Sequence, residues 1–563
     1  MHTRGGPQQR AGFFYNGKTL LSGIDPAGRA DRVAEAVPVM DRTLYICPSP
    51  LYGFGLERLL ARLAVAPNSG VLCIEADPEL FALSREHFNT ALKNNPKIRL
   101  TGCREAAALC SLLRQEWGPR SFRRVEMVRL SGGWQLFPAL YDSLADSLRR
   151  EIALDWGNAM TLTKLGRRYI RNAIRNLTII PQSLPLEKLS FGSDPVLVLG
   201  AGPSLDKLLD ALPARFGESL RQPETRPFRI ICVDTSLPCL KERGIRPDLA
   251  VILESQHWNL GAFAGLSGWN VPTALDLSAL PRSGTVLSGG IFLYFTPWTE
   301  LSIFERLGAA GLLPAVLPPL GSVGLSAMVI ARRVSQGTII TAGLDFSFTM
   351  DSFHARATPG HLGKLLRQNR LGGLLNTEAA FDRPAFTMVS KTGDPVLSSP
   401  ALRNYRSLFE REFAGGAVPR IFDLAGSGLP LGLRTISPET AFNLLSVNGT
   451  YTHSTIPAAA RADKSAAAEN LRDFIRNEQD RLTLLRNILT GEAAADYQTL
   501  EVLVNECDYL WTHFPDYAAA GRRPGIAELE AGSPAVLSFL KRLRAEIDPF
   551  LKLWSIAESA LRD

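Results

Sequence analysis

The sequence contains no cysteine pair of the kind that binds zinc. Its seven cysteines are odd in number and scattered, and none forms a CxxC pair. We therefore expect neither a zinc site nor a disulfide framework. The N-terminal stretch MHTRGGPQQRAGFFYNGK also lacks an apolar core of signal-peptide length, which predicts a cytoplasmic protein.

An uninterrupted apolar run that could cross a membrane is also missing. The stretch 307–331 carries no charge and has the necessary length, but Pro314, Pro318, Pro319 and several glycines interrupt it. We expect a proline-containing loop followed by a buried helix, and no membrane association.

Neither sign of charge dominates the chain. Its 62 Lys and Arg residues stand against 55 Asp and Glu residues, which gives a net charge of +7 over 563 residues. This small excess suits an anionic substrate and does not indicate a nucleic-acid partner. With 45% hydrophobic and 21% charged residues, the composition is typical of a globular protein with sizeable cores.

The first two parts of the chain are residues 1–155 and residues 156–190. The first contains a strand at 44–47, a glycine-containing turn, a helix and a second strand that ends near Glu75, which is the outline of a Rossmann-like domain. Glu75 is a candidate for binding a ribose hydroxyl, and a purely structural module is the alternative. The second part holds an amphipathic bridging helix, 161–177, whose basic face we expect in solvent.

The other two parts are an alternating region, 191–435, and a helical region, 436–563. Strands are expected at 196–199, 229–233, 249–253, 291–295 and 338–342. Their alternation with helices predicts an α/β domain with a mostly parallel sheet, covered by helices on both faces. In the last region apolar residues recur at helical intervals, which predicts a helical domain.

The motif GAGPSL follows the first strand of the alternating region and opens a helix. Such a turn can bind phosphate, because free N–H groups and the positive end of the helix dipole meet there. Gly200 and Gly202 would let the backbone approach a ligand closely. Pro203 suits the first helical position, and Ser204 offers a hydroxyl group. No GK[ST] follows and a third glycine is missing, so the motif is neither a P-loop nor an NAD fingerprint.

Polar residues also follow other predicted strands, at the edge where parallel sheets bind ligands. Asp234 and Thr235 follow the second strand and Glu254 follows the third, and they are candidates for binding a nucleoside sugar. Gly321 and Ser322 open another helix, which is a second candidate for binding an anion.

The last predicted strand is followed by an aspartate and a histidine. Asp345 comes shortly after the strand, and His354 lies nine residues later on a loop. A carboxylate at a strand end and a nearby imidazole are a candidate orienter and general base.

Several longer motifs share one order along the chain. They are NGKTLLSGIDPAGRADR, LYGFGLERLL, GAGPSLD, VDTSLPCLKERGIRPDLAVILES, PLGSVGLSAMVIA and AGLDFSFTMDSFHA. Together they resemble the motility-associated factor (Maf) flagellin glycosyltransferases, whose central domain is shared with MptE-like 6-hydroxymethylpterin pyrophosphokinases. The central domain is also similar to that of bacterial sialyltransferases that use a CMP-activated sugar. The resemblance covers nearly the whole chain.

The resemblance implies transfer of a nonulosonic (sialic-acid-like) sugar from a CMP donor to Ser or Thr of flagellin, in support of flagellar assembly and motility. It implies His354 as the catalytic base beside Asp345, and Tyr294 as a phosphate contact by position. The residues implied at the nucleotide are Gly200, Gly202, Pro203, Ser204, Asp234, Thr235, Glu254, Gly321 and Ser322.

The resemblance fixes no cofactor and leaves a Mg²⁺ requirement open. Two alternatives to the glycosyltransferase are an ATP-dependent 6-hydroxymethylpterin pyrophosphokinase and a non-catalytic binding protein on the same fold.

Overall fold

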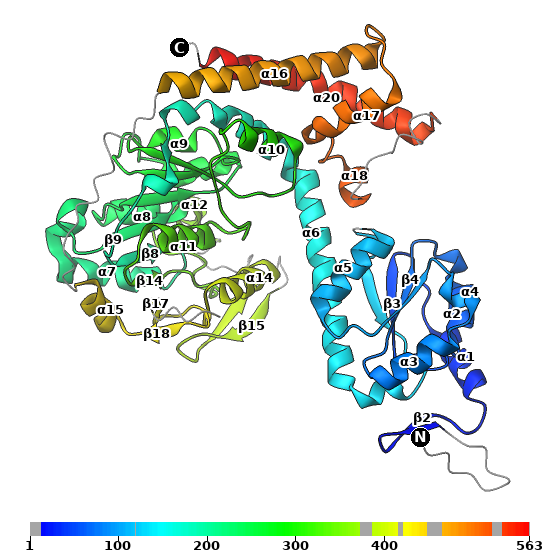
Figure 1. Ribbon diagram of the computed structural model, residues 1–563. Coiled ribbons are helices and arrows are strands. Elements are labelled where there is room, and N and C mark those ends of the chain that lie inside the picture. The colour runs from blue at the N-terminus through cyan, green and yellow to red at the C-terminus, as the bar shows by residue number, and fades with distance from the viewer. Residues whose placement is uncertain are drawn as a thin grey trace. The chain divides into compact units, whose positions relative to one another are not determined.

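The computed structural model describes residues 13–118, 120–371, 385–414, 420–446, 464–520 and 532–561. The chain forms two compact units, which Figure 1 colours by residue number. One consists of Met1–Gly166 and Trp511–Gly525, and the other of Arg167–Leu510 and Ile526–Asp563.

The first unit contains a four-stranded parallel sheet. Its strands lie in the order β5 (Ile98–Thr101), β4 (Gly70–Ile74), β3 (Thr43–Pro48) and β6 (Arg124–Met127). Buried residues alternate between the two faces of the sheet, so that α1 (Pro26–Ala36) and α2 (Leu56–Arg62) share one core and α5 (Ala106–Trp117) belongs to the other. The Rossmann-like fold predicted for this part is confirmed.

A single helix, α6 (Pro138–Leu177), runs for 40 residues. It is much longer than the predicted bridging helix at 161–177, because the preceding stretch also has apolar residues at helical spacing. Leu144 and Leu148 from that stretch are buried in the first unit. The predicted basic face, with Lys164, Arg168, Arg171 and Arg175, is exposed as expected.

The second unit is built on a ten-stranded sheet in which every pairing is parallel. The predicted mostly parallel α/β domain is therefore confirmed. Its strands lie in the order β13 (Ala315–Val316), β12 (Ile291–Phe295), β11 (Thr273–Asp276), β10 (Leu249–Ile252), β9 (Arg229–Val233), β8 (Val196–Leu199), β14 (Ile339–Ala342), β17 (Ile421–Leu424) and β18 (Arg434–Ile436), with β7 (Leu184–Pro185) beside β12.

Helices cover both faces of this sheet (Figure 1). Val196 and Val198 face α11 (Val323–Val334), whereas Leu197 and Leu199 face α7 (Leu205–Phe216) and α8 (Leu237–Glu242). This division follows from the alternation of side chains along a strand. Helix α11 is the buried helix predicted after the proline-containing loop, and nine of its twelve residues are buried.

The described residues after 464 are mostly helical, as predicted. Helix α16 (Lys464–Thr490) packs along α20 (Pro534–Ser559), and α17 (Tyr497–Glu506) joins them. Glu478 on α16 is buried and bonded through both oxygens to Arg306 on α10 (Ser302–Ala309), which ties these helices to the sheet domain. None of the helices in the described ranges is both long and apolar enough to cross a membrane.

Replacing Gly200 tests the backbone packing at the end of β8. A Cβ at this position would lie 2.3 Å from the carbonyl oxygen of Gly343, and backbone cannot easily move away. We expect Gly200→Ala to lower the free energy of unfolding by about 3 kcal/mol, measured by urea titration. The matched control is Gly308→Ala in helix α10, where the nearest atom is an ordinary 3.9 Å away. Equal stability of the two variants would contradict the packing.

Candidate functional site

The carboxyl ends of the parallel strands form one edge of the large sheet. Strands β9 to β13 lie on one side of β8, and the chain then returns to the other side of β8 at β14. The point at which the strand order reverses in this way is where doubly wound sheets bind ligands. The loops that follow β8, β9, β10 and β14 carry most of the predicted site residues. The fold therefore brings these residues to one edge.

At the end of β8, Gly200 and Gly202 lie against the turn after β14. A Cβ at Gly202 would lie 2.5 Å from Asp345 Oδ2, and the Gly202 N–H donates to the Gly343 carbonyl at 2.8 Å. The two glycines therefore allow two turns of this protein to approach each other. From the sequence, we expected these glycines to let a ligand approach the backbone closely.

Ser204 and Asp345 join these two turns by two hydrogen bonds. The Ser204 N–H donates to Asp345 Oδ2 at 2.7 Å, and the Ser204 hydroxyl donates to Oδ1 at 2.5 Å. Burial raises the pKa of Asp345, and the Ser204 bonds oppose that effect. The N-terminus of α7 thus already holds a carboxylate of the protein itself at the position expected for phosphate.

A buried lysine completes this group, which we name the closed cluster (Ser204, Asp345, Lys391 and Asp423). Lys391 Nζ lies 2.6 Å from Asp423 Oδ1, with side chains only 5% and 1% exposed. Burial raises the pKa of Asp423 to about 6, and Lys391 opposes the shift. Asp423 Oδ2 has no hydrogen-bond partner. The sequence pattern did not indicate Lys391 and Asp423, because their contact joins the turn after β15 (Phe386–Val389) to strand β17, 32 residues further along the chain.

Asp234 and Thr235 form a turn after β9. Asp234 is buried; its Oδ1 accepts from the Thr235 N–H and hydroxyl, and its Oδ2 accepts from Asn259 at 3.0 Å. Burial raises the pKa of Asp234. Among the described residues, no group of three His, Cys, Asp or Glu side chains could hold a metal ion. Through these hydrogen bonds, Asp234 holds the loop after β9 in place.

Glu254, after β10, lies among partly exposed aromatic residues, and we name this group the open cluster (Glu254, Tyr169 and Tyr405). Burial raises the pKa of Tyr169 to about 12, and the charge of Glu254 adds to this shift. Burial also raises the pKa of Tyr405, and the charge of Glu254 adds to that shift as well. Tyr169 comes from α6, where its ring lies 5.3 Å from that of Trp298. Tyr405 comes from α14 (Pro400–Phe409). Neither tyrosine was predicted as a site residue.

Helix α11 begins at this edge, beside the open cluster. Gly321 has a positive φ of 69°, and a Cβ there would lie 3.4 Å from the Tyr405 ring. Ser322 is the N-cap residue and has an extended backbone, but its side chain makes no capping bond. Unlike α7, this twelve-residue helix has no carboxylate of the protein bonded at its start among the described hydrogen bonds. The second predicted anion-binding position therefore has the better geometry.

His354 lies on the loop after β14, next to the GAGPSL turn. The adjacent Ala355 N–H donates to the Ala201 carbonyl at 2.9 Å. Burial, with a contribution from the charge of Lys364, lowers the pKa of His354 to about 4. The carboxylate of Asp345 accepts its described hydrogen bonds from Ser204 and none from His354, so Asp345 does not orient the imidazole directly in this structure.

Two asparagines of α6 fix the loops of the open cluster. Asn172 Nδ2 donates to the carbonyls of Ser255 and Ser278, and Asn176 Nδ2 donates to those of Leu277 and Ala279. Spaced four residues apart, they lie on one side of the helix. This spacing was a readable signal in the sequence.

Tyr294 is contradicted as a phosphate contact. Its side chain is fully buried, and its hydroxyl donates to the Ile252 carbonyl at 3.0 Å. A strand residue of a covered sheet faces a core and cannot reach the edge. Asp276, at the end of the unpredicted strand β11, is also buried and accepts bonds from Ser278 and Thr296.

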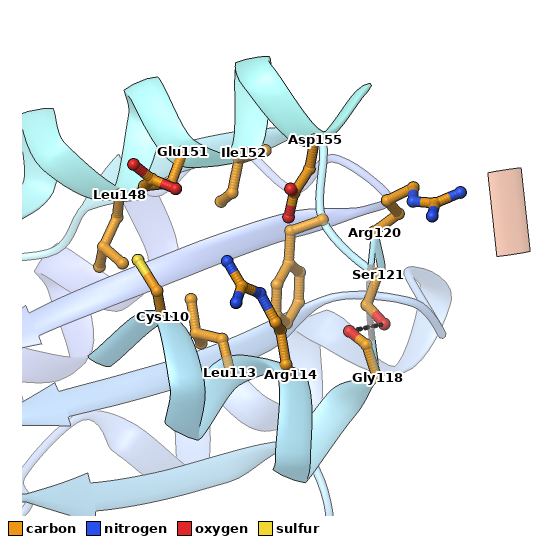
Figure 2. Close-up of a pocket in the computed structure, with 11 residues that line it drawn as sticks. Cys110, Leu113, Arg114, Gly118, Arg120, Ser121, Leu148, Glu151, Ile152 and Asp155 are labelled. Atoms are coloured by element: carbon orange, nitrogen blue, oxygen red, sulfur yellow. Dashed lines mark hydrogen bonds between the residues drawn. The ribbon is translucent and has the colours of Figure 1, made fainter. Parts of the chain in front are cut away.

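In the first unit, the candidate residue Glu75 is already bonded within the protein. Glu75 is buried and accepts a 2.6 Å bond from the Ser49 hydroxyl, and burial raises its pKa to about 7. Figure 2 shows a pocket between α5 and α6, with Arg114 on one wall and Glu151 and Asp155 on the other. Its volume of about 30 Å³ admits a water molecule and no nucleotide.

Comparison with known proteins agrees with this architecture. Residues 167–351 match the family described as 6-hydroxymethylpterin diphosphokinase MptE-like. An uncharacterized protein of Treponema pallidum (strain Nichols) is 29% identical, over 97% of this chain and 94% of that protein. A Maf glycosyltransferase from Magnetospirillum magneticum AMB-1 has a similar fold, with a TM-score of 0.51 and 14% identity over 100% of this chain and 90% of that one. The predicted resemblance, a Maf-like fold with an MptE-like domain, is confirmed.

Removing Lys391 tests the closed cluster. We expect Lys391→Met to lower the free energy of unfolding by about 3 kcal/mol, because it leaves a buried carboxylate without its cation. Adding Asp423→Leu should recover much of that loss, because it removes the carboxylate that Lys391 pairs with, while Asp345 keeps its two hydrogen bonds from Ser204. Urea titrations of the two variants measure the difference. A double variant that is as unstable as the single one would contradict the pairing.

The imidazole of His354 should titrate far below its ordinary pKa of 6.5, near 4. Between these values the unfolded chain binds a proton that the folded chain does not, so this residue removes stability as the pH falls from about 6.5 to about 4. NMR titration of the histidine resonances, with His354→Gln to assign the signal, measures the midpoint. A midpoint near 6.5 would contradict the partly buried position of the imidazole.

Proposed function

We propose that this chain, which has the fold of a Maf glycosyltransferase and carries an MptE-like domain, transfers a nonulosonic sugar from a CMP-activated donor to Ser or Thr hydroxyls of flagellin. The observation that carries the proposal is the pairing of two features at one sheet edge. One is the uncapped start of α11 beside the open cluster. The other is His354 on the loop after β14, which the Ala355 N–H bonds to the Ala201 carbonyl and where burial lowers the pKa of the imidazole.

Both features are attached to the same pair of turns. The first turn of α11 packs against Leu344, since a Cβ at Gly324 would lie 2.5 Å from Leu344 Cδ2. The His354 loop is bonded to Ala201. The closed cluster holds these turns together, so Ser204 and Asp345 position both sides of the site.

In the proposed reaction the CMP phosphate binds at Gly321 and Ser322, where free N–H groups and the helix dipole stabilise negative charge. Tyr405 lies against this position, and the rings of Tyr169 and Trp298 offer a surface for the base. The bond between the sugar anomeric carbon and the phosphate oxygen breaks, and its electrons leave with CMP. The acceptor hydroxyl forms the new bond to that carbon, and its proton passes to neutral His354.

The pyrophosphokinase alternative is supported by the match of residues 167–351 to the MptE-like family. It would need Asp234 and Glu254 to bind Mg²⁺ beside ATP. Both oxygens of Asp234 already accept hydrogen bonds, and this favours the glycosyltransferase. A Mg²⁺ requirement of the transfer itself is left to experiment.

The nucleotide site is tested by calorimetry and thermal shift with CMP, ATP with Mg²⁺, and GTP. We expect CMP to bind and to raise the unfolding temperature, because a ligand that binds the native state stabilises it. Tyr405→Ala should weaken CMP binding about tenfold, which corresponds to about 1.4 kcal/mol. Tyr497→Ala, an exposed tyrosine on α17, is the matched control. Binding of ATP with Mg²⁺ but not CMP would favour the alternative.

Catalysis is tested separately. His354→Gln should retain CMP affinity and lower the rate of sugar transfer to purified flagellin by about 10²–10⁴-fold, measured by mass spectrometry of flagellin. A variant with an unchanged transfer rate would exclude His354 as the base. Full cellular motility with this variant would favour the non-catalytic binding protein.

A further inference from the structure

Asp206 lies in the first turn of α7, directly after the GAGPSL turn, and it binds the loop that carries His354. The Arg356 N–H donates to both Oδ1 and Oδ2 of Asp206 at 3.1 Å. Arg356 follows His354 by two residues, whereas Asp206 lies 150 residues before Arg356 in the chain. An acidic residue in the first turn usually stabilises its own helix through the helix dipole. The carboxylate of Asp206 also holds the backbone of a distant loop.

The turn after His354 has a strained backbone that depends on such contacts. Ala357 has a positive φ of 67°, in the left-handed region that residues with a Cβ rarely adopt. Its N–H donates to His361 Nδ1 at 3.2 Å, and the preceding N–H, that of Arg356, is the one that Asp206 binds. A strained conformation persists only where the surrounding structure fixes it. Asp206 is therefore one of the contacts that maintain this turn.

The same turn places α12 (Pro359–Arg367) against the imidazole. The second residue of α12 is Gly360, and a Cβ there would lie 3.1 Å from His354 Nδ1. Thr358 is the N-cap residue of α12, and its hydroxyl donates to the Ala355 carbonyl at 2.7 Å. A displaced turn would move α12 away from the ring, and the partial burial of His354 would be lost.

Two arginines hold the Asp206 carboxylate in its position. Arg243, the C-cap residue of α8, donates to Asp206 Oδ1 at 3.1 Å, and the Arg356 guanidinium lies 3.5 Å from the same oxygen. Both arginines also pair with Asp210, one helical turn further along α7. The Asp206 side chain is 19% exposed and that of Asp210 is 53% exposed. Among the described hydrogen bonds, Asp206 accepts from a backbone N–H and Asp210 does not.

We propose that Asp206 is a positioning residue for His354, which it holds beside the acceptor hydroxyl by binding the N–H of the turn that follows the imidazole. This inference rests on the proposed function. A displacement of a catalytic group by about 1 Å can lower a rate by about 10²-fold. The hydrogen bond that fixes this turn therefore contributes to kcat. None of the described contacts of Asp206 involves the start of α11, so CMP affinity should not depend on it.

A purely structural role of Asp206 predicts a different result. Asp206 and Asp210 share both arginine partners. If only the ion pairs mattered, replacing either carboxylate would have a similar and small effect. Removing Asp210 breaks ion pairs with the same two arginines but leaves the backbone hydrogen bond in place. The two positions therefore form a matched pair for experiment.

The test compares full-length Asp206→Ala with Asp210→Ala as the matched control. We expect Asp206→Ala to lower kcat for sugar transfer to flagellin about tenfold to a hundredfold, while the KM for flagellin and the Kd for CMP stay unchanged. Asp210→Ala should keep kcat within about twofold of wild type. Asp206→Asn retains an oxygen that accepts from the Arg356 N–H, so it should recover most of the lost rate.

Two further measurements do not require sugar transfer. Hydrogen exchange of the segment 352–361, measured by mass spectrometry, should become about tenfold faster in Asp206→Ala and stay unchanged in Asp210→Ala. The pKa of His354, which burial lowers to about 4 in the wild type, should rise towards 6.5 in Asp206→Ala, because the imidazole becomes more exposed. NMR titration of the histidine resonances measures this shift.

Equal kcat values in Asp206→Ala and Asp210→Ala would overturn the proposal, and so would an unchanged His354 titration in Asp206→Ala. If Asp206→Ala does not fold, a kcat of Asp206→Asn lowered about tenfold, or wild-type exchange of 352–361 as fast as in an unfolded chain, would overturn it as well. If Asp206→Ala changes the exchange and the titration as expected but the wild type transfers no sugar, the proposed function alone is contradicted.

Discussion

The close approach of the turns after β8 and β14 is the constraint on which the site depends. The Gly200 and Gly202 positions have no space for a side chain, because the backbone of Gly343 and the carboxylate of Asp345 occupy it. The carboxylate of Asp345 then joins the two turns by accepting two hydrogen bonds from Ser204. This arrangement fixes the relative position of the His354 loop and the first turn of α11.

This constraint also explains why the two helix starts at the edge differ. The positive end of the α7 dipole is compensated by Asp345, a group that the folded protein provides for itself. Helix α11 follows β13, and the side chain of its N-cap serine makes no capping bond. Anion binding is therefore more favourable at α11, although the glycine motif before α7 is the more conspicuous one in the sequence.

The buried polar groups of the second unit mostly serve to hold loops in place. Asn172 and Asn176 bind four loop carbonyls, Asp276 accepts bonds from two hydroxyls and two N–H groups, and Glu478 anchors the C-terminal helices. Apart from the side-chain oxygen of Asn176, which has no hydrogen-bond partner, these groups are bonded in a region of low dielectric, where an unpaired polar group is costly. The open cluster is the contrasting case, because its tyrosines are partly exposed.

The sequence by itself determined the parallel α/β fold, the limits of β8, β9 and β12, and the helical end of the chain. These features depend on local periodicity and on glycine turns, which a sequence displays directly. It also predicted that Asp345 and His354 follow a strand of the large sheet, and in the structure both follow β14. It missed β11, because four residues give too short a pattern, and it underestimated the length of α6.

Only the tertiary structure decided which of the predicted residues meet. Lys391 joins Asp423, Asp345 joins Ser204 instead of His354, and Tyr294 lies in a core. These contacts link segments separated by up to 141 residues, and no local pattern encodes such distances. The physical reason is that burial and pairing depend on how the turns pack, whereas propensity depends only on neighbours along the chain.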